Sequence, residues 1–152
     1  MVKKEKYEIL LSQAEALIDH NVDLIANMSN IAALLHETFH FWWTGFYRVM
    51  PVGGSQSEQL VLGPFQGPIA CTRIGFGKGV CGTSWQRMQT VIVPDVEQFK
   101  GHIACSSESR SEIVVPIIRE GRVVAVLDVD SRELNTFDET DQLYMERIVA
   151  ML

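Results

Sequence analysis

Three cysteines lie in the central part of the chain, where their thiols could act in redox or nucleophilic chemistry. Cys71, Cys81 and Cys105 form no Cys-x-x-Cys pair, so a structural zinc site is not expected. A free cysteine is most often a small buried hydrophobic residue, and this alternative stays open for each thiol taken singly. The loop that ends at Cys105 offers backbone amides and a partly positive His102, which would lower the pKa of a thiol there and make it a better nucleophile.

Two carboxylates alternate with apolar residues in residues 127–130, whose sequence is Leu-Asp-Val-Asp. Because residues i and i+2 point to the same face of a strand, Asp128 and Asp130 leave one side of it, about 6–7 Å apart. Like charges at this separation repel, so at least one pKa is expected to rise. A carboxylic acid beside a thiolate is an acid–nucleophile pair for a reaction with a leaving oxygen. The alternative is a solvated strand face, which antiparallel sheets commonly have.

Residues 36–40 (HETFH) match the zinc-hydrolase pattern His-Glu-x-x-His. The pattern ends a predicted helix just before a strand, and Trp43 and Phe46 occupy the region where a third ligand would follow. We therefore expect no metal there. His36 and His40 are expected to face solvent near the helix C-terminus, where they interact favourably with the helix dipole.

Residues 77–82 (GKGVCG) match the dinucleotide-binding pattern Gly-x-Gly-x-x-Gly and precede a predicted helix. The strand before them is short, and no second mononucleotide-binding half fits in the remaining chain, so no nicotinamide site is expected. The glycines instead predict a tight loop that presents helix N-terminal amides, with Cys81 near the positive end of the helix.

Changes in hydrophobic period divide the chain into the elements that must position these groups. Apolar stripes with helical spacing predict helices over residues 7–18, 24–35 and 144–152. Residues 136–139 (TFDE) have the spacing of a capping box, with Thr136 as the cap. A short helix is predicted near residues 80–88. Strands are predicted over residues 41–49, 59–65, 91–93, 113–118 and 122–130.

The order of these elements predicts the fold class. The last two strands are expected to form a hairpin through residues 119–122, and Pro116 is expected to need a bulge or a sheet edge, because proline cannot donate to a ladder. Helices at both ends of mostly hairpin-connected strands predict an α+β fold, with the helices on one face of a mostly antiparallel sheet. The functional loops are expected in the irregular segment 67–111. No repeat or composition break divides residues 1–152, so a single domain is expected.

Composition narrows the class of partner. The 13 basic and 19 acidic residues give a net charge of −6, which argues against nucleic acid and against an anionic membrane surface. No apolar stretch approaches the ~18 residues of a membrane span, and the N-terminus lacks the pattern of a signal peptide. Three scattered cysteines do not make a secreted disulfide framework, so a reducing, cytoplasmic compartment is expected.

From Trp43 onward, the chain resembles the free methionine-(R)-sulfoxide reductases, which are single-domain enzymes of the GAF fold. The resemblance rests on seven motifs that keep their order and spacing. They are residues 63–67 (GPFQG), 69–71 (IAC), 77–83 (GKGVCGT), 93–95 (VPD), 101–105 (GHIAC), 111–114 (SEIV) and 127–130 (LDVD). Two features depart from the family pattern: Ser106 stands where an acidic residue is frequent, and the loop at residues 51–59 is longer than in compact relatives.

The resemblance implies a role for particular residues. The nucleophile falls on Cys105, the resolving cysteine on Cys71, and an auxiliary or alternative resolving thiol on Cys81. The implied substrate-binding residues are Trp43 and Tyr47, the loop residues Ile103 and Ala104, and the carboxylates Glu112, Asp128 and Asp130.

The implied reaction reduces free L-methionine (R)-S-oxide to methionine. The Cys105 thiolate attacks the sulfoxide sulfur while Glu112 or Asp130 supplies a proton, and Cys105 becomes a sulfenic acid. Cys71 then forms a disulfide with Cys105, which a thioredoxin-type reductant reopens. No metal or organic cofactor is implied, and a homodimer is left open.

Two other functional classes compete with this interpretation. A GAF sensory module would bind a cyclic nucleotide or another small effector without catalysis, and a structural module would only dimerise. The three cysteines of the reductase pattern, and the lack of a following effector domain, argue against the sensor. The same-face pair Asp128 and Asp130 argues against the purely structural role.

Overall fold

The computed structural model describes residues 1–54, 57–102 and 108–152, and its centre is a six-stranded antiparallel sheet. The strand order across the sheet is β3-β2-β1-β6-β5-β4. The strands are β1 (Trp43–Pro51), β2 (Glu58–Gln66), β3 (Arg73–Ile74), β4 (Val91–Val93), β5 (Ser111–Arg119) and β6 (Arg122–Ser131). The helices are α1 (Lys3–Leu17), α2 (Leu24–Phe39), α3 (Gly79–Arg87) and α4 (Glu139–Ala150), with a short 3₁₀ turn at Val96–Gln98.

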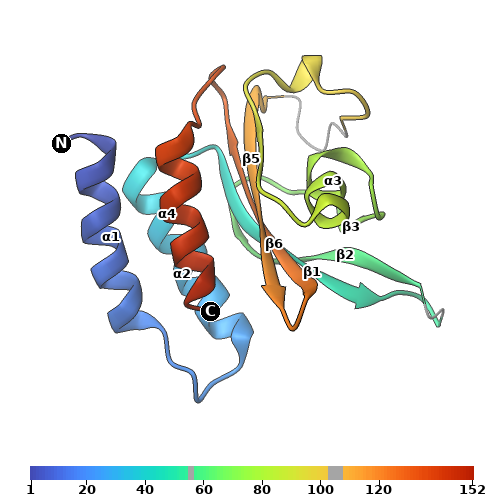
Figure 1. The fold of residues 1–152 in the computed structure, drawn as a ribbon, viewed down its shortest axis with the longest axis horizontal. Coiled ribbons are helices and arrows are strands. Elements are labelled where there is room, and N and C mark those ends of the chain that lie inside the picture. Colours follow the sequence, from blue (N-terminus) through green and yellow to red (C-terminus); the bar gives the residue numbers. More distant parts are fainter. Residues whose placement is uncertain (55–56, 103–107) are drawn as a thin grey trace.

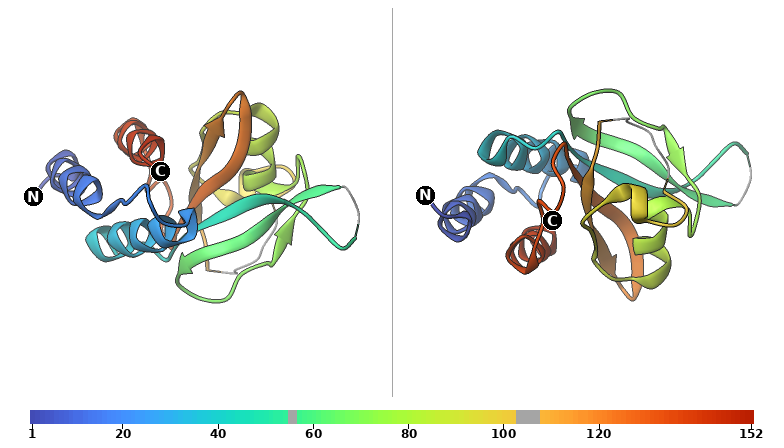
Figure 2. Two further views of the ribbon diagram at one scale, coloured as in Figure 1. Left: turned by 90° about the horizontal axis from the view of Figure 1, so that it is seen from below. Right: turned by 90° about the horizontal axis from the view of Figure 1, so that it is seen from above.

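The helices divide between the two faces of the sheet. Helices α1, α2 and α4 lie on one face, and the short α3 lies on the other with most of the long loops (Figures 1 and 2). The α+β class and the placement of the terminal helices on one face are therefore confirmed. None of the described helices combines the length and hydrophobicity that crossing a membrane requires.

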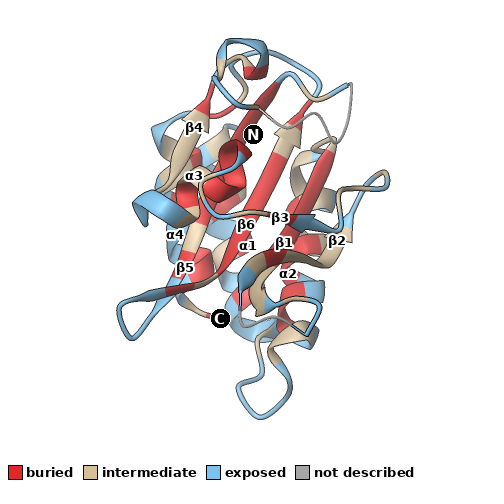
Figure 3. Ribbon diagram, turned by 90° about the vertical axis from the view of Figure 1, so that its right-hand side faces the viewer, coloured by how far each residue is buried: buried red, intermediate tan, exposed pale blue. Residues whose placement is uncertain are grey.

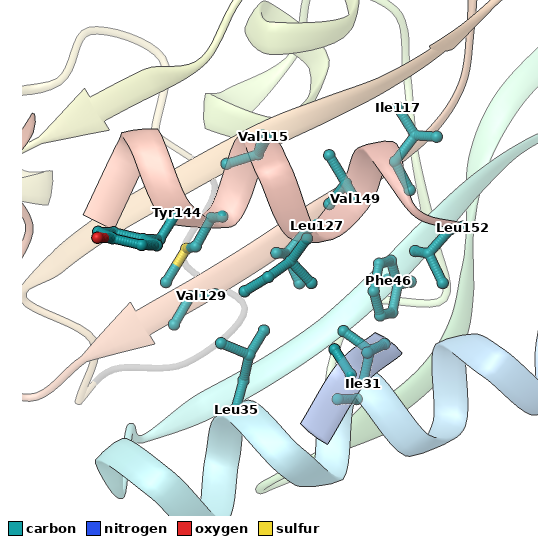
Figure 4. Packing of buried hydrophobic residues seen from close by; sticks show 14 of the residues in the cluster. Ile31, Leu35, Phe46, Val115, Ile117, Leu127, Val129, Tyr144, Val149 and Leu152 are labelled. Atoms are coloured by element: carbon teal, nitrogen blue, oxygen red, sulfur yellow. The ribbon is translucent and has the colours of Figure 1, made fainter. Parts of the chain in front are cut away.

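Alternation along the central strands builds a separate core on each face. Toward the three helices, Phe46, Leu127 and Val129 pack against Ile31 and Leu35 of α2 (Figure 4). The alternate residues of these strands point to the opposite face of the sheet. There they form a second cluster, which includes Tyr47, Val114 and Val126. Figure 3, which looks onto the α3 side, shows buried residues along β1 and β6. The middle of the sheet is thus covered on both faces, so Val126 and Asp128, which β6 directs toward α3, are buried.

A buried polar contact ties the first helix to the last. The Tyr7 hydroxyl donates to Asp141 Oδ1 at 2.6 Å, and Lys3 Nζ donates to Asp141 Oδ2 at 2.6 Å. Asp141 is only 1% exposed, so its oxygens rely on these two donors and on the backbone N–H of Asp138 for their hydrogen bonds. A buried carboxylate that kept only one of them would lose stability.

The β5–β6 hairpin turns as predicted. Glu120 and Gly121 form its two-residue loop with φ values of 52° and 76°, the left-handed pair that a tight hairpin requires. On one side of β5, Pro116 pairs with Val126 of β6. On the other side, β4 pairs with β5 only as far as Val114, so Pro116 has no partner strand there among the described residues. The register shifts directly after it, between Ile117 and Ile118. Both parts of the proline prediction are confirmed.

The predicted capping box is wrong by two residues. Asp138 caps α4 by accepting from Thr140 N at 2.9 Å and Asp141 N at 3.3 Å, and Asp141 Oδ2 accepts from Asp138 N at 2.9 Å. Thr136 instead donates to Ser131 Oγ at 2.6 Å. The threonine is held by the end of β6, and an aspartate pair with the same three-residue spacing serves the helix equally well.

Candidate active site

A cavity opens on the α3 side of the sheet, where β1, β5 and β6 meet α3 and the loop that follows β2. Its volume is about 50 Å³, several times the roughly 10–15 Å³ that one water molecule needs. The described residues that line it are Trp42, Trp43, Tyr47, Ile69, Ala70, Ile74, Gly79, Val80, Cys81, His102, Ser109, Glu112, Asp128 and Asp130. Three carboxyl groups and no lysine or arginine are among these lining residues, so the site favours a cation.

The sheet register brings the three carboxyl groups together. Asp128 and Asp130 alternate on β6, and Glu112 of β5 is paired with Asp130 across the ladder. Because Leu127 and Val129 fill the helix-side core, all three carboxyl groups point toward α3. Glu112 and Asp128 are each 6% exposed. The solvated-face alternative for the aspartates is therefore wrong.

Burial changes the protonation of these groups. Desolvation, followed by the charges of Asp128 and Asp130, raises the pKa of Glu112 well above its usual range. Desolvation and the charge of Asp128 likewise raise the pKa of Asp130, although a 2.8 Å hydrogen bond from Ser109 Oγ opposes the rise. Burial also raises the pKa of Asp128, and hydrogen bonding with Glu112, Cys81 and Asp130 counteracts it. The prediction that at least one pKa rises is confirmed, and the cluster retains protons that exposed carboxylates would release.

Cys81 lies in the first turn of α3 and faces the same carboxyl groups. It is a free thiol, 3% exposed. Burial first, and then the charges of Asp128, Glu112 and Asp130, raise its pKa well above the ordinary value. The predicted position near the positive end of a helix is confirmed, but desolvation outweighs the helix dipole. Its surroundings therefore favour the neutral thiol over the thiolate.

The glycines at the start of α3 allow the helix to pack closely against the preceding loop. A Cβ on Gly82 would lie 2.5 Å from the backbone oxygen of Gly75, a contact that no side chain tolerates without a backbone shift. The close approach places Cys81 over Asp128 rather than next to a nucleotide phosphate. The glycine pattern thus serves packing.

An aromatic wall forms the β1 side of the cavity. The Trp43 ring stacks on Phe65 at 5.3 Å and on Tyr47 at 5.9 Å between centroids, and its Nε1 donates to Pro68 O at 3.0 Å. Gly45 lies between Trp43 and Tyr47 on the same face of β1. A Cβ on this residue would stand 2.6 Å from the indole, so the glycine leaves the space that the Trp43 ring occupies. The wall is therefore fixed by stacking from both sides.

Of the two remaining predicted thiols, Cys71 is among the described residues. Cys71 is half-buried and disulfide-bonded, and its backbone oxygen accepts a 2.9 Å hydrogen bond from the Tyr47 hydroxyl. Cys105, Ile103 and Ala104 lie outside the described residues. The structure thus gathers Trp43, Tyr47, Cys81 and the three carboxyl groups around one cavity, with Cys71 anchored to its wall.

Two expectations about histidines need correction. His102 lines the cavity, where desolvation lowers its pKa and the charge of Asp128 opposes this, so its positive form is less favoured than the sequence suggested. His40 is exposed and ends α2 in a left-handed conformation, whereas His36 is half-buried with Nδ1 3.1 Å from Thr44 Oγ1. The sharp turn from α2 into β1 brings Thr44 under His36, and only His40 faces solvent as predicted.

Several lining residues were not identified from the sequence. Trp42 lines the cavity, and the Arg132 guanidinium lies 4.6 Å from the centre of its ring. Ser109 holds Asp130, and Ile69 and Ala70 extend the apolar wall. Nothing in the local pattern marks the serine, but Trp42 directly precedes the predicted aromatic wall and could have been considered with it.

One set of side chains in the cavity has the composition of a metal site. Cys81 Sγ and one oxygen each of Glu112 and Asp128 lie within 4.8 Å of one another. All three residues are buried. No other group of three or more potential ligands occurs among the described residues.

Comparison with known proteins places this architecture in a family. Residues 23–150 match the GAF domain model. The chain is 55% identical over 150 residues to GAF domain-containing protein A of Dictyostelium discoideum, with 99% of this chain and 92% of that protein covered. It is 41% identical over 156 residues to the free methionine-R-sulfoxide reductase of Saccharomyces cerevisiae, with 99% and 85% covered.

A solved structure agrees with these relatives. The X-ray structure of free methionine-R-sulfoxide reductase from Neisseria meningitidis in complex with its substrate superposes with a TM-score of 0.94 at 49% identity, covering 99% of this chain and 88% of that one. The resemblance inferred from the seven motifs is confirmed over the whole length of the chain. The chain therefore belongs to the GAF-domain family of free methionine-R-sulfoxide reductases.

Proposed function

We propose that this protein reduces free L-methionine (R)-S-oxide to methionine by a thiol–disulfide mechanism. The observation that carries the proposal is the cavity itself, which joins three acidic side chains to a stacked aromatic wall and has no lysine or arginine among its described lining residues. Free methionine sulfoxide has an ammonium group for the carboxylates and a methyl sulfoxide for the aromatic wall. A residue within a peptide lacks that ammonium.

The chemical step begins at Cys105. Its thiolate attacks the sulfoxide sulfur while a carboxylic acid of the cavity protonates the sulfoxide oxygen. The oxygen ends on Cys105 as a sulfenic acid, and methionine leaves. Glu112 and Asp130 are the candidate acids, because burial raises the pKa of each well above the range of an exposed carboxyl group.

Cys71 completes the turnover. Its thiol attacks the sulfenic sulfur, releases the oxygen as water and forms a disulfide with Cys105. The free state of Cys81 and the disulfide-bonded state of Cys71 support this pairing. Cys81 is the alternative resolving thiol. A thioredoxin-type dithiol then reduces the disulfide, which fits a reducing, cytoplasmic compartment.

Substrate turnover tests the proposal directly. With a dithiol reductant, the protein should reduce free methionine-(R)-sulfoxide and leave the S epimer and a peptide-bound sulfoxide unreduced. Cys105→Ser should abolish turnover, because a hydroxyl is a far weaker nucleophile than a thiolate. A Cys81→Ser protein is the matched control, and it should keep most of the rate.

Mass mapping identifies the resolving thiol. One equivalent of substrate without reductant should produce a Cys71–Cys105 disulfide. A wild-type rate in Cys105→Ser would refute the mechanism. A disulfide found only between Cys81 and Cys105 would move the resolving role to Cys81.

A further inference from the structure

We propose that Cys81, Glu112 and Asp128 form a binding site for a thiophilic divalent cation, of which Zn²⁺ is the example, inside the cavity. Binding of the ion does not depend on the proposed reaction. The inhibition expected from it does rest on the proposed function, because the ion would occupy carboxylates assigned there to the substrate.

The positions of the three ligands suit a small cation. Their ligand atoms lie within 4.8 Å of one another, whereas tetrahedral zinc with bonds of about 2.0–2.3 Å holds its ligands roughly 3.3–3.8 Å apart. A closure of about 1 Å by side-chain rotation forms the site. The cavity that these residues line has room for a water molecule as the fourth ligand.

The ligands come from rigid parts of the fold. Cys81 stands in the first turn of α3, which is pressed against the preceding loop at Gly82. Glu112 and Asp128 stand on adjacent strands, β5 and β6, where Asp128 is paired with Val114 two residues along from Glu112. The three elements are already in contact, so little ordering accompanies binding.

An orphaned oxygen points to a missing ligand. Asp128 is 6% exposed, and its Oδ1 has no hydrogen-bond partner among the described residues. Leaving a buried carboxylate oxygen unpaired is costly, and a bound cation removes that cost. His102 is the one basic side chain among the described lining residues, so the cavity supplies no lysine or arginine for the role.

The sulfur distinguishes a metal from an ammonium group. A carboxylate pair alone accepts hydrogen bonds from any ammonium, and a neutral thiol adds little to that interaction. When the ion binds, the Cys81 thiol releases its proton to solvent. The resulting thiolate ligand selects soft or borderline ions such as Zn²⁺, Cd²⁺ and Co²⁺ over Mg²⁺ and Ca²⁺. The third ligand is therefore the reason to expect a thiophilic ion.

A protein with a single thiol tests the site. In a Cys71→Ser/Cys105→Ser protein, Cys81 is the one remaining cysteine. Titration with Co²⁺ or Cd²⁺ should produce a thiolate-to-metal charge-transfer absorption with one ion per chain. A further Cys81→Ser substitution should remove this absorption. Zn²⁺ should displace Co²⁺, and Mg²⁺ should not.

The carboxylates are tested against a charge-matched control. In the same background, Asp128→Asn and Glu112→Gln should each weaken binding roughly tenfold or more, as expected for the loss of a coordinating group. Asp130→Asn removes the same charge from the same cavity without removing a ligand, so its loss of affinity should be several times smaller. Circular dichroism establishes that each variant is folded, and a metal-dependent rise in Tm gives a second readout.

Three outcomes would overturn the proposal. They are no charge-transfer absorption in the folded single-thiol protein, an equal loss of affinity in Asp130→Asn and Asp128→Asn, and retention of the absorption in the Cys81→Ser protein. The single-thiol protein cannot turn over by the proposed mechanism, so these results are independent of activity. In the wild-type enzyme, Zn²⁺ should raise the apparent KM for the sulfoxide, and a chelator should reverse the effect.

Discussion

Among the cavity's carboxyl groups, Glu112 and Asp130 differ in their surroundings although they are paired across two strands. Ser109 Oγ donates to Asp130 Oδ1 at 2.8 Å, which favours the ionised form of Asp130. The pKa of Glu112 is raised by desolvation and by the charges of Asp128 and Asp130. When one proton is shared by such a pair, the group that lacks support for its anion keeps it. Glu112 is therefore the better proton donor, and Asp130 the better partner for a substrate ammonium.

This difference predicts opposite kinetic effects. Glu112→Gln should lower kcat by roughly 10²–10⁴-fold, the usual contribution of a general acid, with a small change in KM. Asp130→Asn should mainly raise KM, because it removes an interaction present before the chemical step. Ser109→Ala should change the pH dependence of KM more than kcat. Steady-state rates with free methionine-(R)-sulfoxide would contradict the assignment if Asp130→Asn lost kcat and Glu112→Gln kept it.

The residues of the site differ in how well they can be predicted from the sequence alone. Asp128 and Asp130 follow from strand alternation, since a period of two residues fixes a shared face. Glu112 needs the register between β5 and β6, which no local pattern reports, so only the family resemblance identified it. The lowered pKa of His102 could not be predicted, because desolvation depends on what packs around the ring, and that packing comes from distant segments.

Helix α3 is the element that connects the fold to the site. Its first turn carries Cys81, and the approach of Gly82 to the Gly75 oxygen sets its distance from the sheet. A change that lifts this helix would move the thiol away from Asp128 without touching a site residue.

Gly82→Ala tests the role of this helix. A Cβ there would meet a backbone oxygen at 2.5 Å, so the substitution should cost about 1–3 kcal/mol of unfolding free energy, as overpacking does. It should also lower turnover. The matched control is Gln86→Ala on the exposed side of the same helix, which should stay within about 0.5 kcal/mol of wild type. Urea denaturation measures both, and equal stability of the two variants would show that the contact is not tight.

Elements with a long, regular pattern were predicted best. Helices α1, α2 and α4 and strands β5 and β6 have apolar residues at one clear period, and their bounds agree with the structure to within a few residues. Strand β3 has two residues, too few to show a period, and it exists because β2 offers it a partner. The cap of α4 was misplaced because two candidate boxes overlap, and tertiary hydrogen bonds decide between them.

For the molecule as a whole, the site lowers the free energy of unfolding. Three carboxyl groups are placed on the face of a central sheet that is covered on both sides. The pKa of Glu112 is higher in the folded protein than its ordinary value of 4.5. A group with a raised folded-state pKa contributes stability below its unfolded pKa, and that contribution is lost as the pH rises through the folded pKa.

Removing this carboxyl group should therefore stabilise the fold at neutral and alkaline pH. We expect Glu112→Gln to raise the free energy of unfolding there by about 0.5–2 kcal/mol, or Tm by a few degrees. The gain should be small at a pH below about 4, where Glu112 is protonated in both the folded and the unfolded protein. The exposed Glu15→Gln is the control and should show no such dependence. Thermal unfolding across this pH range measures the effect. A gain that is largest in acid would contradict it.

The two halves of the site also differ in how far apart their residues lie along the chain. The three carboxyl groups belong to one hairpin with a two-residue turn, whereas the cysteines occupy three separate positions before it. A hairpin is assembled by local pairing and is held in the centre of the sheet, so its residues are constrained by the fold as a whole. The separate positions of the cysteines can be substituted one at a time. Over evolutionary time, such substitutions can remove the thiol chemistry while the hairpin retains a pocket for a cationic ligand, and the path from an enzyme to a binding module on this scaffold is short.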